Sequence, residues 1–220
     1  MAYRRTENVL RRLAARHEAI LGAARALATE AGINAVQIAP VAERSGIAAG
    51  TVYRYFPSKT ELIAALVTAV SEHEIGAMRR AADAAPGPLS ALAAALTTFA
   101  AHALASRRLA FALIAEPVDA DTEKARQPYR AALSAEIAKR LAAAMSAGFV
   151  PDQDVKFAAP ALVGALAEGL VGPLAPQTRD ETQQRDAVQA LTLFALRAVG
   201  VADARARGLV VQARLPARAS

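Results

Sequence analysis

Apolar residues recur at helical spacing along almost the whole chain. In its N-terminal part, Ile20, Ala23, Ala24 and Leu27 form one stripe at positions i, i+3, i+4 and i+7, and Gly32 is placed to end that helix. Strand signals are nearly missing, since there is no long alternation of β-branched and polar residues and no Asn-Gly or Asp-Gly turn. The pattern predicts an all-α protein.

Four helices are expected in the N-terminal part. They cover residues 8 or 17 to 31, residues 38–44, residues 49–55, and a long stretch that begins after Ser58 and ends before the Pro-Gly-Pro of 86–88. Ser58 and Glu61 have the spacing of a capping box, and Gly46 can take the positive φ that a turn between the two short helices needs. The long helix is expected to connect two modules.

Helix-breaking residues divide the remainder into further helical segments. These are expected at 89–106, 107–115, 121–147, 153–173 and 181–200, and the tail of 205–220 is expected to be loose. The stretch 84–106 has no charged residue and is long enough to span a bilayer. Its alanine-rich composition, with proline, glycine and hydroxyl residues, instead favours a helix buried inside a larger helical domain, so no membrane is expected as a partner.

Charge is distributed unevenly along the 220 residues. The formal net charge is +6, and residues 1–60 contain nine Lys or Arg against four Asp or Glu, whereas residues 61–202 contain thirteen against fifteen. A basic module on a slightly acidic body suggests a polyanionic partner, with nucleic acid ahead of a membrane surface, although a solvated charged face is the plain alternative. The absence of cysteine and of a secretion signal fits a cytoplasmic protein.

Residues 49–59 combine aromatic and basic side chains. On a helix, Val52 and Phe56 fall on one face and are expected to point into the core. The open side then carries Gly50, Thr51, Tyr53 and Arg54, with Tyr55 at its edge and Lys59 at the start of the next helix. Hydroxyl, phenol and cationic groups of this kind contact phosphates and base edges, and two short helices around a glycine turn have the geometry of a helix-turn-helix.

The run from 38 to 67 resembles the DNA-binding signature of the tetracycline-repressor-type (TetR) regulators. The matching elements are Val41-Ala42, Ser45-Gly46-Ile47, Gly50-Thr51-Val52-Tyr53, Tyr55-Phe56 and Ser58-Lys59-Thr60-Glu61-Leu62. The resemblance implies a homodimer that binds palindromic operator DNA and is released by a small-molecule effector. It also implies DNA contacts by Thr51, Tyr53, Tyr55 and Lys59, with contributions from Ala49, Gln37 and Ala39. The chain departs from the pattern at Ala48, where a capping serine or threonine is usual, and at the apolar Ala49.

The resemblance sets the expected domain plan. Residues 1–60 form a helix-turn-helix domain with a basic arm that includes Arg4, Arg5, Arg11, Arg12 and Arg16, and residues 61–204 form a helical ligand-sensing and dimerisation domain. The arm is either a further DNA contact or a solvated tail. The last two long helices are expected to build the dimer bundle, with Leu162, Leu166, Val188, Leu191, Ala195 and Val199 at interface or core positions.

An apolar pocket is expected in the second domain. Its candidate residues are Phe99, His102, Phe111, Ile114, Glu116 and Tyr129, although each is individually more typical of ordinary core packing. Such a cavity suits a lipophilic or aromatic effector. The three histidines, His17, His73 and His102, are scattered in sequence and do not predict a metal site.

No catalytic constellation, nucleotide-binding loop or cofactor motif is recognisable, so no catalytic residue and no cofactor are assigned. The favoured interpretation is a ligand-responsive transcriptional regulator, with repression as the expected mode. The alternatives are a constitutive or architectural DNA-binding protein whose second domain only dimerises, and, more distantly, a helical enzyme or small-molecule carrier.

Overall fold

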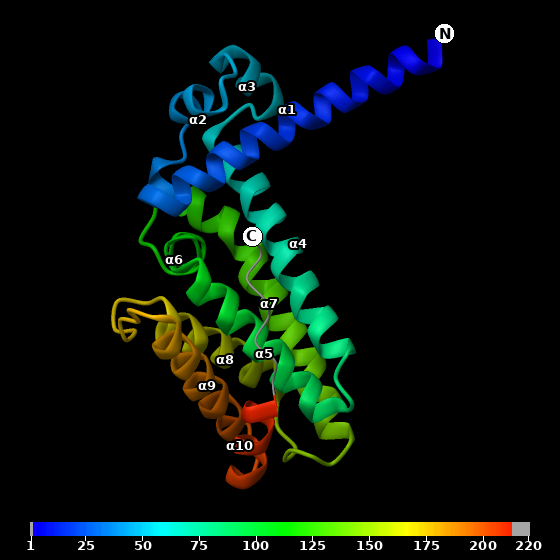
Figure 1. Ribbon diagram of the computed structural model, residues 1–220, viewed down its shortest axis with the longest axis vertical. Coiled ribbons are helices and arrows are strands. Elements are labelled where there is room, and N and C mark those ends of the chain that lie inside the picture. The colour runs from blue at the N-terminus through cyan, green and yellow to red at the C-terminus, as the bar shows by residue number, and fades with distance from the viewer. Residues whose placement is uncertain (1, 213–220) are drawn as a thin grey trace.

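A computed structural model describes residues 2–212, with side chains described from residue 9 onward (Figure 1). The described residues form helices without any strand, which confirms the predicted all-α class. The elements are α1 (Ala2–Ala31), η1 (Ile33–Ala35), α2 (Ile38–Ser45), α3 (Ala49–Tyr55), α4 (Lys59–Asp83), α5 (Pro88–Ala105), α6 (Arg107–Ile114), α7 (Ala120–Ser146), α8 (Val155–Leu170), α9 (Glu181–Ala198) and α10 (Asp203–Gln212).

Helices α1, α2 and α3 form a small N-terminal unit. Ile20 and Ala24 of α1 are fully buried, as are Val41 of α2 and Val52 of α3, so the stripe read from the sequence is the core of this unit. Helix α1 begins earlier than expected and continues without interruption from Ala2. At 1.5 Å per residue its 30 residues extend about 45 Å, and its N-terminal half projects beyond the body of the protein (Figure 1).

The basic arm therefore continues α1 as a helix. The side chains of Arg4 and Arg5 lie outside the described residues, so their proposed DNA contact stays a prediction. Arg11, Arg12 and Arg16 stand on the exposed surface of the projecting part. The exposed Val9, Leu10 and Leu13 accompany them, which makes this part of α1 both basic and apolar.

Helix α4 links the two parts of the molecule. Its first turn begins as predicted, because the Ser58 hydroxyl accepts a hydrogen bond of 3.1 Å from the backbone N–H of Glu61. Along its length α4 contacts α1 in the N-terminal unit and α5 and α7 in the larger domain. A displacement of α4 would therefore be felt in both parts.

Helix α5 is the central helix of the larger domain and contacts α4, α6, α7, α8, α9 and α10. Leu92, Ala93 and Thr98 point in three different directions around it and are each at most 4% exposed, which explains why the sequence shows no charged face there. By length and composition the span Pro88–Ala105 could cross a membrane, but 67% of it is buried within the fold. That burial matches the expected core helix.

The remaining helices cover α5 on several sides, and side-chain caps fix where they begin. Asp119, Asp154 and Asp180 accept hydrogen bonds of 2.8 or 2.9 Å from backbone N–H groups in the first turns of α7, α8 and α9. Pro128 and Pro160 lie inside α7 and α8. The segment boundaries predicted from helix-breaking residues agree with these helices to within a few residues.

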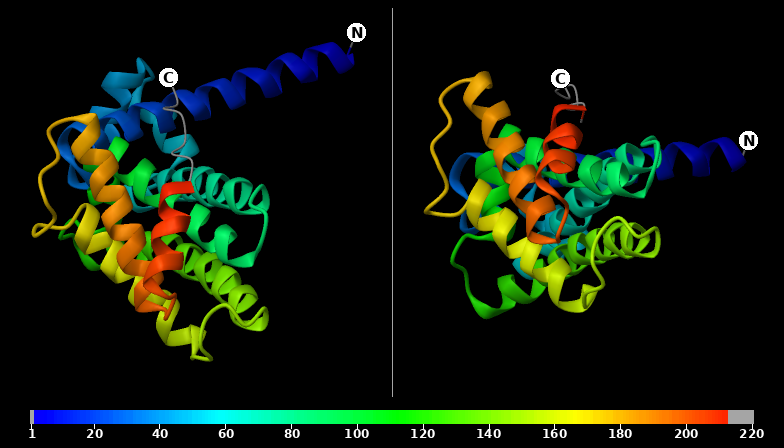
Figure 2. Two further views of the ribbon diagram at one scale, coloured as in Figure 1. Left: turned by 60° about the horizontal axis from the view of Figure 1, so that its bottom comes forward. Right: turned by 90° about the horizontal axis from the view of Figure 1, so that it is seen from below.

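The C-terminal tail differs from the expectation. Residues 205–212, predicted to be loose, belong to α10, which packs against α9 with Ala206 fully buried and Val210 7% exposed (Figure 2). The two apolar side chains stand four residues apart and share one helix face, a signal that the scattered arginines obscured. Residues 213–220 lie outside the described part of the chain.

Candidate DNA-binding surface and sensing pocket

The turn between α2 and α3 has the geometry that the sequence predicts. Gly46 adopts φ 66°, in the left-handed region, and its N–H bonds to the carbonyl of Glu43 at 3.2 Å. The N–H of Ile47 closes the turn on Ala42 at 3.1 Å, and the Ile47 side chain is half-buried. Helices α2 and α3 are thereby held as a helix-turn-helix.

Helix α3 is anchored on its inner face. Val52 is fully buried and Phe56 is 4% exposed, as the helical spacing predicted. At its N-terminus no side chain caps the helix, and the N–H groups of Thr51 and Val52 bond to the backbone carbonyl of Ala48. Packing, rather than capping, therefore fixes the helix.

The outer face of α3 and the start of α2 form one open surface. The predicted DNA contacts that lie exposed are Gln37, Ala39, Ala49, Gly50, Tyr53 and Arg54, whereas Thr51, Tyr55 and Lys59 are half-buried. Tyr53 is 52% exposed, and Arg54 makes no ion pair with any described residue. A phenol and a free guanidinium on adjacent positions of a short helix can reach phosphates and base edges.

Tyr55 differs from the expectation. Its hydroxyl is buried and has no hydrogen-bond partner among the described residues, and its ring lies 6.4 Å from that of His17 on α1. Position 55 therefore turns toward α1 rather than toward the open face. In this arrangement Tyr55 supports the helix, and its hydroxyl is not available to a phosphate.

Lys59 stands at the junction with the second domain. Its ammonium lies 3.8 Å from the carboxylate of Asp119, the residue that caps α7. Hydrogen bonds from Thr122, together with Lys59, hold the pKa of Asp119 below its usual value. A phosphate approaching Lys59 would compete with this carboxylate, so Lys59 connects the DNA-binding unit to the larger domain.

The second domain contains a small cavity beside α4, α5, α6 and α7. Its volume is about 30 Å³, and it is lined by Arg25, Val70, Glu74, Phe99, His102, Ala103, Ser106, Leu109, Ala110, Leu113 and Tyr129. Phe99, His102 and Tyr129 were predicted as pocket residues, whereas Phe111, Ile114 and Glu116 do not line this cavity. Glu116 instead accepts a hydrogen bond from Ile33 in the N-terminal unit.

Several lining residues were not anticipated from the sequence. Arg25 belongs to α1, so the DNA-binding unit contributes to the wall of the cavity. Val70 and Glu74 are four residues apart on α4. This spacing, which puts both on one face of the helix, is the only sequence signal that predicts their proximity. The lining residues other than Ser106 come from five helices, α1, α4, α5, α6 and α7, and residues that meet in this way leave no local sequence pattern.

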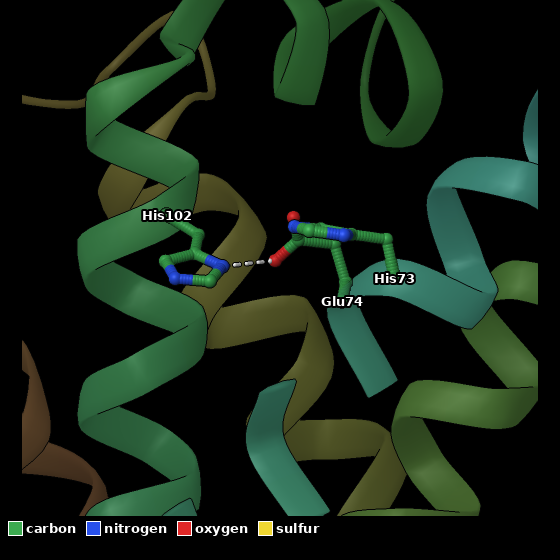
Figure 3. A group of neighbouring side chains, drawn as sticks. All are labelled: His73, Glu74 and His102. Carbon is green, nitrogen blue, oxygen red and sulfur yellow. Dashed lines mark hydrogen bonds and ion pairs between the residues drawn. The ribbon is translucent and has the colours of Figure 1, made fainter. Parts of the chain in front are cut away.

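Two polar lining residues of the cavity, Glu74 and His102, face each other, and His73 lies beside them (Figure 3). The Nδ1 of His102 on α5 lies 2.8 Å from the carboxylate of Glu74 on α4, and the rings of His73 and His102 stack with 6.2 Å between their centroids. Burial, together with the nearby Glu74 carboxylate, raises the pKa of Tyr129, so its phenol stays neutral. Two histidines judged too scattered in sequence are thus neighbours in space.

The residues predicted for the dimer interface are mostly in the core of one chain. Leu162, Leu166, Val188, Ala195 and Val199 are each between 1% and 4% exposed, and Leu191 is half-buried. A side chain already buried within its own chain offers no area to a partner. The outward faces of α8 and α9 carry other residues, among them Phe157, Ala161, Gly164, Ala190 and Phe194.

The N-terminal unit matches a known protein family. Residues 20–66 match the family described as bacterial regulatory proteins, tetR family. Over 48 residues the chain is 54% identical to the HTH-type transcriptional repressor KstR of Rhodococcus jostii and 50% identical to that of Mycobacterium tuberculosis. These matches span 22% of this chain and only 23% and 22% of the length of the two relatives.

Solved structures extend the likeness to most of the chain. A structure of RolR with the ligand resorcinol has a TM-score of 0.69 at 23% identity, covering 94% of this chain and 98% of that one. A structure of the regulator FadR from Bacillus subtilis in complex with stearoyl-CoA has a TM-score of 0.67 at 20% identity, covering 83% and 97%. At these identities the likeness concerns the fold.

Proposed function

We propose that the chain, whose residues 20–66 match the tetR family of bacterial regulatory proteins, is a ligand-responsive transcriptional repressor. It binds a palindromic DNA operator as a homodimer and releases it when a small molecule occupies the second domain. The observation that carries this proposal is the open face of α3, where Tyr53 and Arg54 lie exposed on a helix anchored by Val52 and Phe56.

DNA binding rests on the division of labour within α3. Arg54 is placed to contact a base edge or a phosphate, while Tyr53 and Thr51 donate hydrogen bonds to phosphates of the DNA backbone. Ala49 and Gly50 at the start of the helix have no bulk, so the groove edge can approach closely, and an alanine methyl can contact a thymine methyl. Tyr55 is left out of this set because its hydroxyl is buried.

Dimerisation is assigned to the outward faces of α8 and α9. Phe157, Ala161 and Gly164 follow one another at helical spacing on α8, and Phe194 stands 52% exposed on α9. Large aromatic side chains beside small residues suit close packing against a second copy of the same two helices. A two-fold dimer would present two α3 helices to DNA about one turn, ~34 Å, apart.

The effector is proposed to be a small molecule with an apolar body and at least one oxygen. Phe99, Leu109 and Leu113 supply apolar walls, while His102, Tyr129 and Glu74 supply polar contacts. A cavity of about 30 Å³ admits little more than water. Ligand pockets measure about 300 Å³ or more, so an effector must separate the surrounding helices to enter.

This requirement couples the pocket to DNA. Helix α1 contributes Arg25 to the cavity wall, and α4 contributes Val70 and Glu74. Separating the walls therefore moves α1 and α4, the helices that support the DNA-binding unit. To convert nearly all of the protein from the DNA-bound arrangement to the DNA-free one, the effector must bind the second arrangement about 10⁴-fold more tightly than the first. The effector must therefore bind the open arrangement much more tightly than the closed one.

The test begins with selection of bound sequences from a random DNA pool, followed by affinity measurement on the selected site. Arg54→Ala is expected to weaken binding about tenfold to a hundredfold, from the 1–3 kcal/mol of one base contact. Arg80→Ala removes the same charge at the far end of α4 and serves as the matched control. Equal affinities for the two variants would contradict the docking of α3.

A metabolite panel separates regulation from constitutive binding. The same DNA-binding assay is repeated with phenols, aromatic acids, fatty acids and acyl thioesters. Release by one class supports the ligand-responsive repressor, whereas unchanged affinity across the panel favours a constitutive or architectural DNA-binding protein whose second domain only dimerises.

A further inference from the structure

We infer that His73, Glu74 and His102 form a binding site for a divalent metal ion of the zinc type, at the wall of the cavity. One potential ligand atom from each residue lies within 4.8 Å of the other two. His73 and Glu74 come from α4 and His102 comes from α5 (Figure 3). The site goes beyond DNA binding and does not depend on the proposed function.

The donor set has the chemistry of a zinc site. Two imidazole nitrogens and one carboxylate oxygen bind Zn²⁺ at about 2.0–2.2 Å, and three protein ligands are typical of sites that keep a fourth position open. Softer thiolate ligands are absent from the chain, and an oxygen-only set for Mg²⁺ or Ca²⁺ does not match two imidazoles.

Little movement is needed to close the site. Glu74 and His102 are already 2.8 Å apart, and ligands of a tetrahedral zinc ion stand about 3.4 Å from one another. His73 is exposed, and no hydrogen bond or ion pair with a described residue holds it. A rotation of the His73 side chain therefore brings the third nitrogen to the ion.

A simpler explanation is that Glu74 and His102 form an ordinary ion pair. His73 takes no part in such a pair, so its substitution would leave the pair intact. A three-ligand site would lose one coordinating atom when His73 is substituted. His73 therefore separates the two explanations, and because it is exposed, its substitution does not disturb the core.

Glu74 and His102 both line the cavity, so an ion held by them would lie at its wall and be accessible from it. An oxygen anion such as a phenolate or a carboxylate could bind the ion there, and the hydroxyl of Tyr129, which lines the same cavity, could donate a hydrogen bond to it. This step rests on the proposed function, since it specifies the effector as an oxygen-donor anion bound through the metal.

The test uses the full chain with a histidine-free purification tag, after removal of metal with a chelator. Titration with ZnCl₂ is followed calorimetrically, and CoCl₂ is added in parallel because tetrahedral Co²⁺ has a strong visible absorption. We expect one ion per chain, and binding at least tenfold weaker in His73→Gln, with Co²⁺ absorption reduced to the same extent. His102→Gln should weaken binding as well.

His17→Gln is the matched control, because His17 is the third histidine and packs against Tyr55 and Phe56 in the DNA-binding unit. It should leave zinc affinity unchanged, and circular dichroism verifies that each variant is folded. No binding to the wild-type protein at millimolar zinc, or equal affinity in wild type and His73→Gln, would overturn the metal site.

The metal measurement is made without DNA, so its outcome is separate from that of the proposed function. Operator affinity with and without Zn²⁺ is then measured for wild type and His73→Gln. If Zn²⁺ changes the operator affinity of the wild type but not that of His73→Gln, the metal site is linked to the DNA-binding unit. Zinc binding without any change in operator affinity leaves the metal site standing and rejects the effector role.

Discussion

The carboxylate of Glu116 accepts a buried hydrogen bond of 3.0 Å from the backbone N–H of Ile33, 83 residues earlier in the chain. Ile33 begins the short turn η1 that follows α1, and Glu116 lies just after α6. A buried hydrogen bond from a backbone N–H to a charged carboxylate is stronger than a hydrogen bond between two neutral groups. The larger helical part of the protein therefore holds the end of α1, the helix against which α2 packs.

Gly32 makes this close contact possible, and Gly32→Ala is predicted to destabilise the protein. Gly32 adopts φ 92°, which an alanine tolerates poorly, and a Cβ there would lie 2.5 Å from Oε1 of Glu116 and 2.6 Å from Nη2 of Arg108. We expect a loss of about 1–3 kcal/mol in the free energy of unfolding. Urea denaturation followed by circular dichroism measures it.

Gly22→Ala is the matched control for that substitution. Gly22 lies within α1, and a Cβ added there meets nothing within 4 Å. Because alanine favours a helix over glycine, this variant should gain up to about 1 kcal/mol. If Gly32→Ala proved as stable as Gly22→Ala, the close approach of Glu116 to the end of α1 would be wrong.

The local elements could be predicted because their signals lie within a few residues. Ser58 and Glu61 locate the start of α4, and Gly46 locates the turn before α3, since caps and positive-φ turns depend on neighbouring atoms. The open face of α3 and the edge position of Tyr55 follow from helical spacing, but the burial of the Tyr55 hydroxyl does not. A residue at a boundary of two faces is decided by its tertiary neighbours, here His17.

The contacts between distant helices could not be predicted. His73 and His102 are 29 positions apart, and only the packing of α4 on α5 brings them together. Glu116 was predicted as a pocket residue, whereas in the structure its carboxylate accepts a hydrogen bond from Ile33. Likewise, the apolar residues Leu162 and Val188 would suit either the core of one chain or a dimer interface, and the sequence does not distinguish the two. In the structure both are buried within the chain.

The uncapped start of α3 predicts a stabilising substitution. Ala48 occupies the N-cap position with φ −55° and ψ 136°, and it is exposed. A serine there could accept a hydrogen bond from an N–H in the first turn, so Ala48→Ser should add about 1 kcal/mol to the free energy of unfolding. Thermal unfolding without DNA measures the gain.

Ala49→Ser places the same hydroxyl one residue further along, inside the helix. It should give no gain, because a side chain at the first helical position does not cap the helix. A comparable gain in both variants would mean that the effect arises from polarity rather than from capping.

The exposed aromatic residues of α8 and α9 predict the position of the dimer interface. Phe194→Glu should convert the proposed dimer into a monomer of 22.9 kDa, since a charge in the centre of an apolar interface is left without a partner. Sedimentation over a range of protein concentrations measures the change, which we expect to exceed tenfold in the dissociation constant.

Leu10→Glu is the control, since Leu10 is 59% exposed on the projecting part of α1, away from α8 and α9. It should leave the dimer intact. Dissociation by Leu10→Glu but not by Phe194→Glu would move the interface to α1.

The contact between α4 and α7 predicts a dependence of stability on pH. Glu136 is 2% exposed and lies 3.0 Å from Nε of Arg79 and 2.7 Å from Nε of Arg140. Burial opposes the charged form of Glu136, but the two guanidinium partners outweigh it and hold its pKa below the ordinary 4.5. The ion pairs therefore stabilise the fold fully above about pH 4.5, and this stabilisation is lost as the pH falls through the lowered pKa.

Glu136→Gln should cost about 1–3 kcal/mol at neutral pH, because Arg140 loses one of its two carboxylate partners and keeps only Asp83, at 2.8 Å. The difference between wild type and variant should shrink as the pH is lowered below about 4.5, since wild-type Glu136 then becomes protonated as well. Urea denaturation of both proteins across this range measures the difference. Glu72→Gln, an exposed position on α4, should cost little at any pH, and a constant difference for Glu136→Gln would show that its charge does not stabilise the contact.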